Sequence, residues 1–96
     1  MPKGYWITFY RKVTNPDALA AYGKLAKPAI EAGGGRFLAR GLPAKTYEAG
    51  TAERSVLIEF DSLEKAIATI ESSAYQAAAK LLVGAAERDI RVLQGT

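Results

Sequence analysis

The sequence predicts a single α+β domain in which four strands form an antiparallel sheet and the helices cover one of its faces. Four apolar stretches rich in aromatic and β-branched residues alternate with two stretches of helical periodicity. A run of three glycines, residues 33–35, ends the first helical stretch and leads directly into a strand. The chain has 96 residues, 49% hydrophobic and 24% charged, so we expect one core and one domain spanning residues 1–96.

The first half of the chain is predicted to form a strand, a helix and a second strand. Residues 5–13 are rich in aromatic and β-branched side chains and stop before Asn15 and Pro16, which suit the N-cap and first turn of a helix. Pro28 is expected to kink this helix, and residues 37–40 form the second strand. The apolar residues that recur every three or four positions along the helix are Leu19, Tyr22, Ala26, Ala29 and Ile30.

The second half is predicted to form two strands around an interrupted helix. Residues 54–60 are the third strand, after a loop over 41–50 in which Gly and Pro surround a short extended piece. The segment Asp61-Ser62-Leu63-Glu64 is typical of a capping box and starts the second helix. Ser72-Ser73 interrupts it, a helical pattern resumes over 75–86, and residues 90–93 form the fourth strand. This β-α-β-β-α-β order is the ferredoxin-like motif, with the first and third strands at the centre.

Alternation along each strand divides the sheet residues between a side that faces the helices and the opposite side. The helix-facing set is predicted to be Ile7, Phe9, Phe37, Ala39, Val56, Ile58, Phe60, Ile90 and Val92. The opposite set is predicted to be Trp6, Thr8, Tyr10, Leu38, Arg40, Leu57, Glu59 and Leu93. Because this second set is too apolar to be left in water, we expect another copy of the chain to cover it in an isologous homodimer.

The composition excludes several kinds of site. The chain has no histidine and no cysteine, which rules out a Ser-His triad, disulfides and thiolate metal ligands. No cofactor or metal site is predicted, and the glycine run follows a helix instead of opening one, so it is not a phosphate loop. The net charge of +3 is spread among acidic residues, and no apolar run approaches the ~20 residues that span a bilayer. We therefore expect a cytoplasmic protein with neither a nucleic-acid nor a membrane partner.

Four segments spread over nearly the whole chain resemble the domain-of-unknown-function family 1330. They are Lys3-Gly4-Tyr5-Trp6-Ile7, Gly34-Gly35-Arg36-Phe37-Leu38-Ala39-Arg40-Gly41, Ile58-Glu59-Phe60-Asp61-Ser62-Leu63-Glu64 and Ser72-Ser73-Ala74-Tyr75-Gln76-Ala77-Ala78. The resemblance implies a dimeric α/β barrel, similar in fold to cofactor-independent monooxygenases and small lactone isomerases, and leaves the activity open. Thr69 and Ile70 stand where the family often has a Trp-Tyr pair, and Asp61 and Ser73 where it often has prolines. A ligand role for those aromatic residues therefore does not carry over.

The candidate ligand-binding residues are Trp6, Arg40, Glu59 and Tyr75, and no catalytic residue is assigned. Arg40 and Glu59 are predicted to meet on the face away from the helices, either as a structural ion pair or as an anion clamp in which Glu59 orients the ligand or acts as base. Trp6 is either a core or interface anchor or a stacking surface for an aromatic ligand. Tyr75 either directs its hydroxyl into a cleft or is buried, with that hydroxyl hydrogen-bonded to backbone groups near Ser72.

The first functional hypothesis is a homodimer that binds a small anionic or aromatic metabolite, with any catalysis being cofactor-independent proton transfer or oxygenation. The alternative is a structural or binding dimer without turnover, which the absence of histidine favours. A third hypothesis is RNA binding by aromatic residues on an open sheet face. Against it, the third strand carries Val56-Leu57-Ile58-Glu59 in place of a basic and aromatic pattern.

Overall fold

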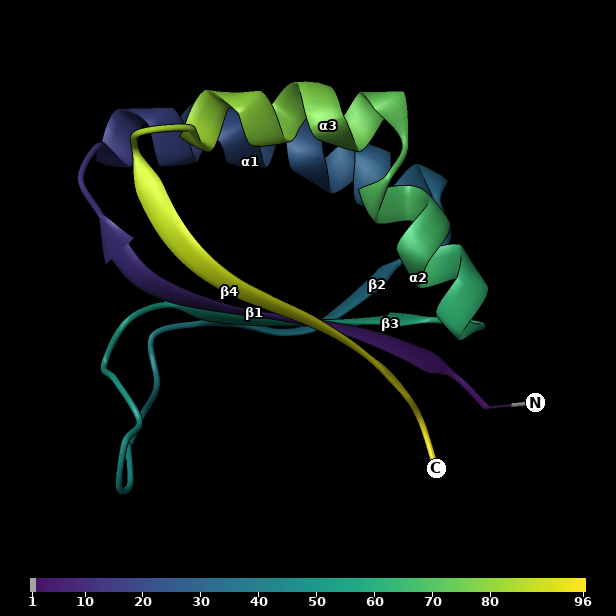
Figure 1. The fold of residues 1–96 in the computed structure, drawn as a ribbon, viewed down its shortest axis with the longest axis horizontal. Helices are drawn as coiled ribbons and strands as arrows, with labels where there is room; N and C mark the ends of the chain where they lie inside the picture. Colours follow the sequence, from purple (N-terminus) through teal and green to yellow (C-terminus); the bar gives the residue numbers. More distant parts are fainter. Residues whose placement is uncertain (1) are drawn as a thin grey trace.

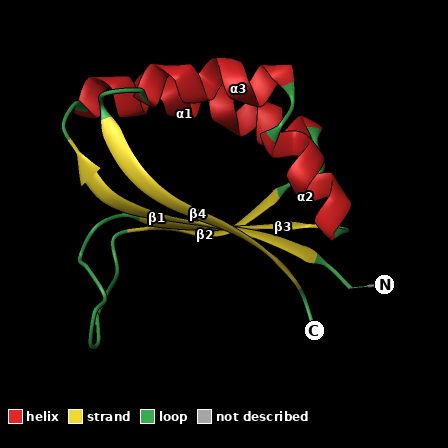
Figure 2. Cartoon of the chain, viewed as in Figure 1, coloured by secondary structure: helices red, strands yellow, loops and turns green. Residues whose placement is uncertain are grey.

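The computed structural model describes residues 2–96 and confirms the ferredoxin-like architecture (Figure 1). Four strands form one antiparallel sheet in the order β2-β3-β1-β4, so β1 and β3 are central, as predicted. The helices cover one face of the sheet, and we call the other face the open face (Figure 2). The elements are β1 (Gly4–Val13), α1 (Pro16–Ala32), β2 (Arg36–Gly41), β3 (Ser55–Phe60), α2 (Leu63–Ile70), α3 (Ser73–Ala79), the 3₁₀ turn η1 (Lys80–Leu82) and β4 (Ala86–Gln94).

Short polar side chains cap each α-helix at its N-terminus. Asn15 caps α1 by accepting a hydrogen bond from the Ala18 amide at 3.1 Å, as its position before Pro16 predicts. Ser62, one residue later than the capping box suggests, caps α2 by accepting from the Lys65 amide at 3.2 Å. Ser72 likewise caps α3, so the predicted interruption is a second helix start.

Two segments differ from the expected secondary structure. The second helical stretch ends at Leu82 instead of continuing to residue 86, because Gly84 turns the chain with a φ of +76° and lets β4 begin at Ala86. The expected extended piece after β2 is an irregular loop over residues 42–54, in which Glu48 has a positive φ of 52°. This loop projects beyond the sheet on the side of the open face (Figure 1).

The predicted face assignment is wrong for β1. Trp6, Thr8 and Tyr10 are buried beneath the helices, and Ile7 and Phe9 therefore lie on the open face. Both alternating sets of this strand are apolar, so hydrophobicity alone does not decide which set goes inside. The larger aromatic side chains take the interior, where they remove more apolar area from water.

The helix side of β3 holds the centre of the core, as predicted. Ile58 and Phe60 are buried, and the Phe60 ring stacks on Trp6 with centroids 6.3 Å apart. Tyr75 of α3 meets the Trp6 indole edge-on, with centroids 4.8 Å apart. These contacts join the sheet to the helical layer around one aromatic cluster.

An irregularity in β2 reverses the predicted orientation of Arg40. The pairing with β3 shifts register between Phe37 and Ala39, which leaves Leu38 as an extra residue in the strand. Beyond this bulge Ala39 pairs with Leu57 on the open face and Arg40 pairs with Val56 on the helix side, so the predicted faces of Ala39 and Arg40 are both wrong. A bulge of this kind has no sequence signature here, because no glycine marks it.

Two glycines give a matched test of close packing. An added Cβ at Gly4 would lie 2.5 Å from the Ser62 carbonyl oxygen and 2.7 Å from the Leu63 Cα, both backbone atoms of the α2 N-terminus. Gly4→Ala is therefore expected to lower the free energy of unfolding by about 2 to 3 kcal/mol through overpacking. Gly23, inside α1, has nothing within 4 Å of such a Cβ. Gly23→Ala is therefore expected to raise the free energy of unfolding by about 0.5 to 1 kcal/mol. Urea unfolding midpoints measure both, and equal effects of the two substitutions would contradict the packing argument.

Candidate functional site

A cleft of about 80 Å³ lies on the helix side of the sheet, between α1 and strands β1, β2 and β3. Its lining combines the aromatic side chains of Trp6, Tyr10 and Tyr22 with the basic side chains of Lys27, Arg40 and Arg54. The three aromatic residues are buried, whereas Lys27 and Arg40 are exposed and Arg54 is half-buried. An aromatic interior with basic groups toward solvent is the general form of a pocket for a ligand with one apolar and one anionic part.

The Thr8 hydroxyl on the floor of the cleft is a polar group that can bind a ligand. The Trp6 indole nitrogen donates to the Thr8 hydroxyl at 2.9 Å, and both residues are buried. The Thr8 hydroxyl accepts this bond, and its own proton has no acceptor among residues 2–96. Thr8 also lines the cleft, so its proton is available to an oxygen atom of a bound molecule.

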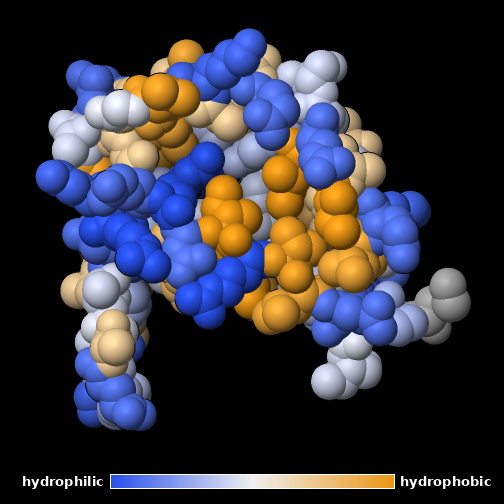
Figure 3. Space-filling model, in the orientation of Figure 1, coloured by the Kyte–Doolittle hydropathy of each residue, from blue (hydrophilic) through white to orange (hydrophobic). Residues whose placement is uncertain are grey.

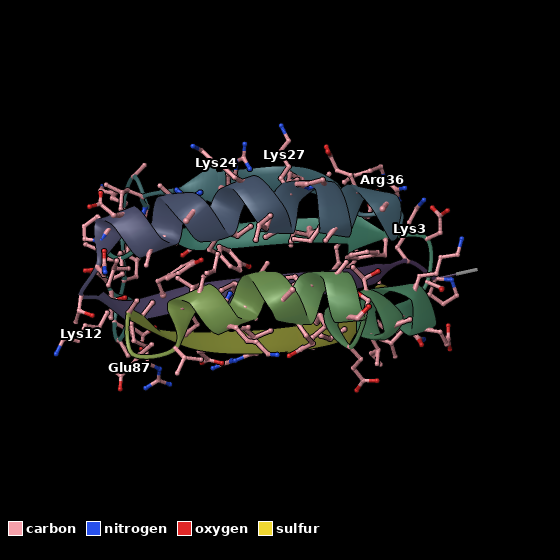
Figure 4. The ribbon with its side chains drawn as sticks, turned by 90° about the horizontal axis from the view of Figure 1, so that it is seen from above. Lys3, Lys12, Lys24, Lys27, Arg36 and Glu87 are labelled. Carbon is pink, nitrogen blue, oxygen red and sulfur yellow. The ribbon has the colours of Figure 1, made fainter. Side chains whose placement is uncertain are left out.

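The basic groups of the cleft have no acidic partners. No Asp or Glu lines the cleft, and within residues 2–96 neither Lys27, Arg40 nor Arg54 forms an ion pair. Figure 4 shows Lys27 projecting from α1 on the side away from α3. The Arg40 guanidinium lies 4.8 Å from the Phe37 ring centroid, a cation–π contact that leaves its N–H groups free to donate. The cleft therefore carries an uncompensated positive charge.

The structure brings together two of the four predicted site residues. Trp6 and Arg40 both line the cleft, but Glu59 lies on the open face and Tyr75 is buried in the core. The predicted contact between Arg40 and Glu59 is therefore wrong: Glu59 instead accepts from Arg36 at 3.1 Å. The Arg36 guanidinium holds the pKa of Glu59 below its usual range, so Glu59 is an ionised partner of Arg36.

Tyr75 satisfies its hydroxyl in an unexpected way. Its oxygen lies 2.7 Å from the Tyr22 hydroxyl oxygen, so the side chain is buried, as in one of the two predicted alternatives, but its hydroxyl does not bond to the backbone near Ser72. Arg88 of β4 donates to both phenol oxygens at 3.1 Å. Sequence reasoning missed Arg88, as well as Lys27 and Arg54 in the cleft. Only the absence of an acidic neighbour in space distinguishes these basic residues, and that is visible only in the fold.

The comparisons with known proteins place the chain in a family. The family model described as domain of unknown function (DUF1330) matches residues 3–96. The chain belongs to the DUF1330 family. No curated protein matches it. The predicted family resemblance is thereby confirmed over nearly the whole chain.

Several solved structures share the fold of this DUF1330 protein. A protein of unknown function from Rhodopseudomonas palustris is 21% identical, with a TM-score of 0.71 over 99% of this chain and 83% of that one. A dimeric ferredoxin-like protein of unknown function from Thermobifida fusca is 16% identical, with a TM-score of 0.68 over 97% and 91%. SnoaB, a cofactor-independent oxygenase from Streptomyces nogalater, is 9% identical, with a TM-score of 0.64 over 100% and 95%. At these identities the likeness shows the fold.

The open face of the DUF1330 protein has an apolar centre and a charged rim. The central side chains are Tyr5, Ile7, Phe9, Leu57 and Leu93, of which Phe9 is 41% and Leu93 52% exposed. Ion pairs border them on both sides, between Arg36 and Glu59 and between Arg91 and Asp89. A further hydrophobic patch lies in the middle of the side where β4 passes below the helices, bordered by hydrophilic residues (Figure 3). None of the helices described over residues 2–96 is long and apolar enough to cross a membrane.

Because the Tyr22 phenol is buried, the free energy of unfolding is expected to fall at alkaline pH. Burial, together with the neighbouring Tyr75 hydroxyl, raises the pKa of Tyr22 well above its ordinary value of about 10. The native state therefore favours the neutral phenol more than the unfolded state does. This contribution is fully present below about pH 10 and is lost as the pH rises above it. Urea unfolding of the wild type and Tyr22→Phe from pH 8 to pH 11 should show a smaller alkaline loss in the variant, and parallel curves would contradict this role.

Proposed function

We propose that this DUF1330 protein is a homodimeric small-molecule-binding protein whose cleft binds a compact organic carboxylate. The observation that carries the proposal is the set of three basic side chains around an aromatic pocket that contains no acidic residue. Arginine binds carboxylates by paired hydrogen bonds, and Arg40 and Arg54 have no ion-pair partners among residues 2–96.

The dimensions of the cleft limit the apolar part of the ligand. Its volume is about 80 Å³, whereas a cavity of about 150 Å³ encloses a whole benzene molecule in an engineered protein. A single ring or short chain therefore enters only in part, over Trp6, while the carboxylate stays at the solvent end near Arg40 and Arg54. Small aromatic carboxylates such as benzoate have this form.

The lining supports binding more than turnover. A general base for neutral pH is normally a histidine or a carboxylate, and the cleft has neither. Burial raises the pKa of Tyr10 and of Tyr22, so both phenols remain protonated near neutral pH and act as hydrogen-bond donors. A non-catalytic role is consistent with these groups, and titration with carboxylates distinguishes it from a purely structural dimer.

The open face supplies the dimer contact in this proposal. Its apolar centre can pack on the apolar centre of a second copy, and the rim carries both positive and negative side chains that can pair across the contact. Such a surface is self-complementary, as an isologous two-fold interface requires. Two of the solved structures with this fold are described as dimeric. Because the open face and the cleft lie on opposite sides of the sheet, dimerisation leaves the cleft accessible. It also covers the face that RNA would need, and Glu59 and Asp89 on that face oppose phosphate binding.

Substitution of the two cleft arginines tests ligand binding. Benzoate is expected to bind the wild type and to raise its melting temperature. Arg40→Met and Arg54→Met should each weaken binding tenfold or more, the usual consequence of losing a charged hydrogen-bond donor. Lys80→Met, which removes the same charge from the exposed end of α3, is the control and should leave the affinity unchanged. Calorimetric titration measures all four proteins, and equal affinities would contradict the proposed site.

If no member of a panel of small aromatic and aliphatic carboxylates binds the wild-type dimer, the structural alternative is favoured. Binding of a single-stranded RNA oligonucleotide by the dimer would instead favour the third hypothesis.

A further inference from the structure

A second basic site lies on the helix side of β4, around Arg88. Arg88 pairs with Tyr10 in the β1–β4 ladder and is half-buried. Its Nη1 atom donates to the hydroxyl oxygens of Tyr22 and Tyr75, each at 3.1 Å, and these oxygens are 2.7 Å apart. We call Arg88, Tyr10, Tyr22 and Tyr75 the Arg88 cluster. Two elements of the helical layer, α1 and α3, therefore hold one end of this guanidinium in place.

The Arg88 cluster carries a positive charge without a counterion. Within residues 2–96, Arg88 forms no ion pair with an Asp or Glu. The phenols do not neutralise it, since burial raises the pKa of Tyr10 and of Tyr22. The guanidinium carbon lies 5.0 Å from the Tyr22 ring centroid and 5.8 Å from that of Tyr10, which compensates the charge only partly. A half-buried charge of this kind is stabilised by an anion.

The opposite edge of the Arg88 guanidinium is available to that anion. No residue from 2 to 96 accepts a hydrogen bond from its Nε or Nη2 atom. No buried side-chain nitrogen or oxygen in this part of the chain lacks a partner, so these two atoms are reached by solvent. The corresponding edge of another arginine binds a carboxylate in this molecule. Arg91 donates from Nε and Nη2 to the two carboxylate oxygens of Asp89, at 3.2 and 2.8 Å. Arg88 offers the same pair of donors, and its bonds to Tyr22 and Tyr75 already fix the orientation of the guanidinium.

We propose that the Nε–Nη2 edge of Arg88, held in place by Tyr22 and Tyr75, is a receptor for a carboxylate group. This site goes beyond the proposed function, because it is built on β4 and uses neither Arg40 nor Arg54. Tyr10 and Tyr22 line the cleft as well, so the two anion sites share these two side chains. Clamping the guanidinium before the ligand arrives reduces the entropy that binding costs.

Nitrogen-15 NMR of the arginine Nε–H groups in the full-length protein tests this site. The cross-peak missing from the Arg88→Lys spectrum identifies Arg88. Sodium acetate is the probe, and it is expected to shift this cross-peak saturably at millimolar concentration, whereas sodium chloride of equal ionic strength is not. The Nε–H groups of Arg36 and Arg91 already donate to Glu59 and Asp89, so they are internal controls that should not move. A static Arg88 cross-peak, or an equal response to chloride, overturns the proposal.

Two sets of substitutions test the clamp and the independence of this site from the cleft. Tyr22→Phe with Tyr75→Phe removes the clamp but keeps the charge, and should raise the acetate dissociation constant about fivefold, the equivalent of one hydrogen bond. Arg40→Met should weaken benzoate binding in the cleft tenfold or more and leave the acetate response of Arg88 intact, so failure of one site does not count against the other. Loss of the Arg88 response in Arg40→Met, or a response to inorganic phosphate alone, contradicts an independent carboxylate site.

Discussion

Replacing Leu57 with aspartate is expected to convert the proposed dimer into a folded monomer. Leu57 lies on the central strand β3, pairs with Ile7 and sits in the middle of the apolar open face. In the dimer, the substitution would bury a carboxylate next to its symmetry-related copy, and two uncompensated like charges in an interface cost several kcal/mol. Sedimentation at micromolar concentration should show half the wild-type mass, with unchanged far-ultraviolet circular dichroism.

The control for this experiment is an aspartate on a surface that the dimer does not use. Val83 is 83% exposed and lies between η1 and β4 on the helix side, so Val83→Asp should remain dimeric. If Leu57→Asp were still a dimer at the same concentration, the interface would lie elsewhere, and the hydrophobic patch along β4 would be the next surface to examine (Figure 3).

Removing the Trp6 side chain is expected to cause the largest loss of stability. The residue is 1% exposed, stacks on Phe60, contacts Tyr75 edge-on and bonds to Thr8. Trp6→Ala leaves a cavity in the centre of the core and should lower the free energy of unfolding by about 3 to 5 kcal/mol. Urea titration followed by circular dichroism measures the change.

Two variants calibrate the effect of Trp6→Ala. Trp6→Phe keeps an aromatic ring in the core but loses the bond to Thr8, so it should fall between the wild type and the alanine variant. Tyr47→Ala removes an aromatic side chain that is 73% exposed and should change stability by less than about 0.5 kcal/mol. A cost for Trp6→Ala no larger than that for Tyr47→Ala would contradict the central place of Trp6 in the core.

The fold was largely predictable because local signals coincide with the topology. Asn15 before Pro16, the glycines after α1 and Ser62 before α2 mark element boundaries through their own backbone chemistry. β4 was predicted too short. Its first half, Ala86-Glu87-Arg88-Asp89, has the charged composition of a surface loop, and the ladder with β1 makes it a strand.

The candidate site was only partly predictable. Trp6 was singled out as a candidate but was placed on the wrong side of the sheet, because Ile7 and Phe9 make the alternative register equally apolar. Arg40 was misplaced by the bulge at Leu38, which shifts every later residue of β2 to the other face. Arg88 was not predicted as a site residue. It is set apart only by its hydrogen bonds to Tyr22 and Tyr75, which lie 66 and 13 positions away in the sequence.

The position of Trp6 gives this protein a built-in optical probe. The chain contains one tryptophan, and it forms part of the cleft floor, shielded from water. All of its indole fluorescence therefore originates at the place where a ligand would arrive. A molecule that enters the cleft changes the surroundings of the emitting group directly, so natural compounds can be screened by following emission intensity and wavelength without attaching a dye.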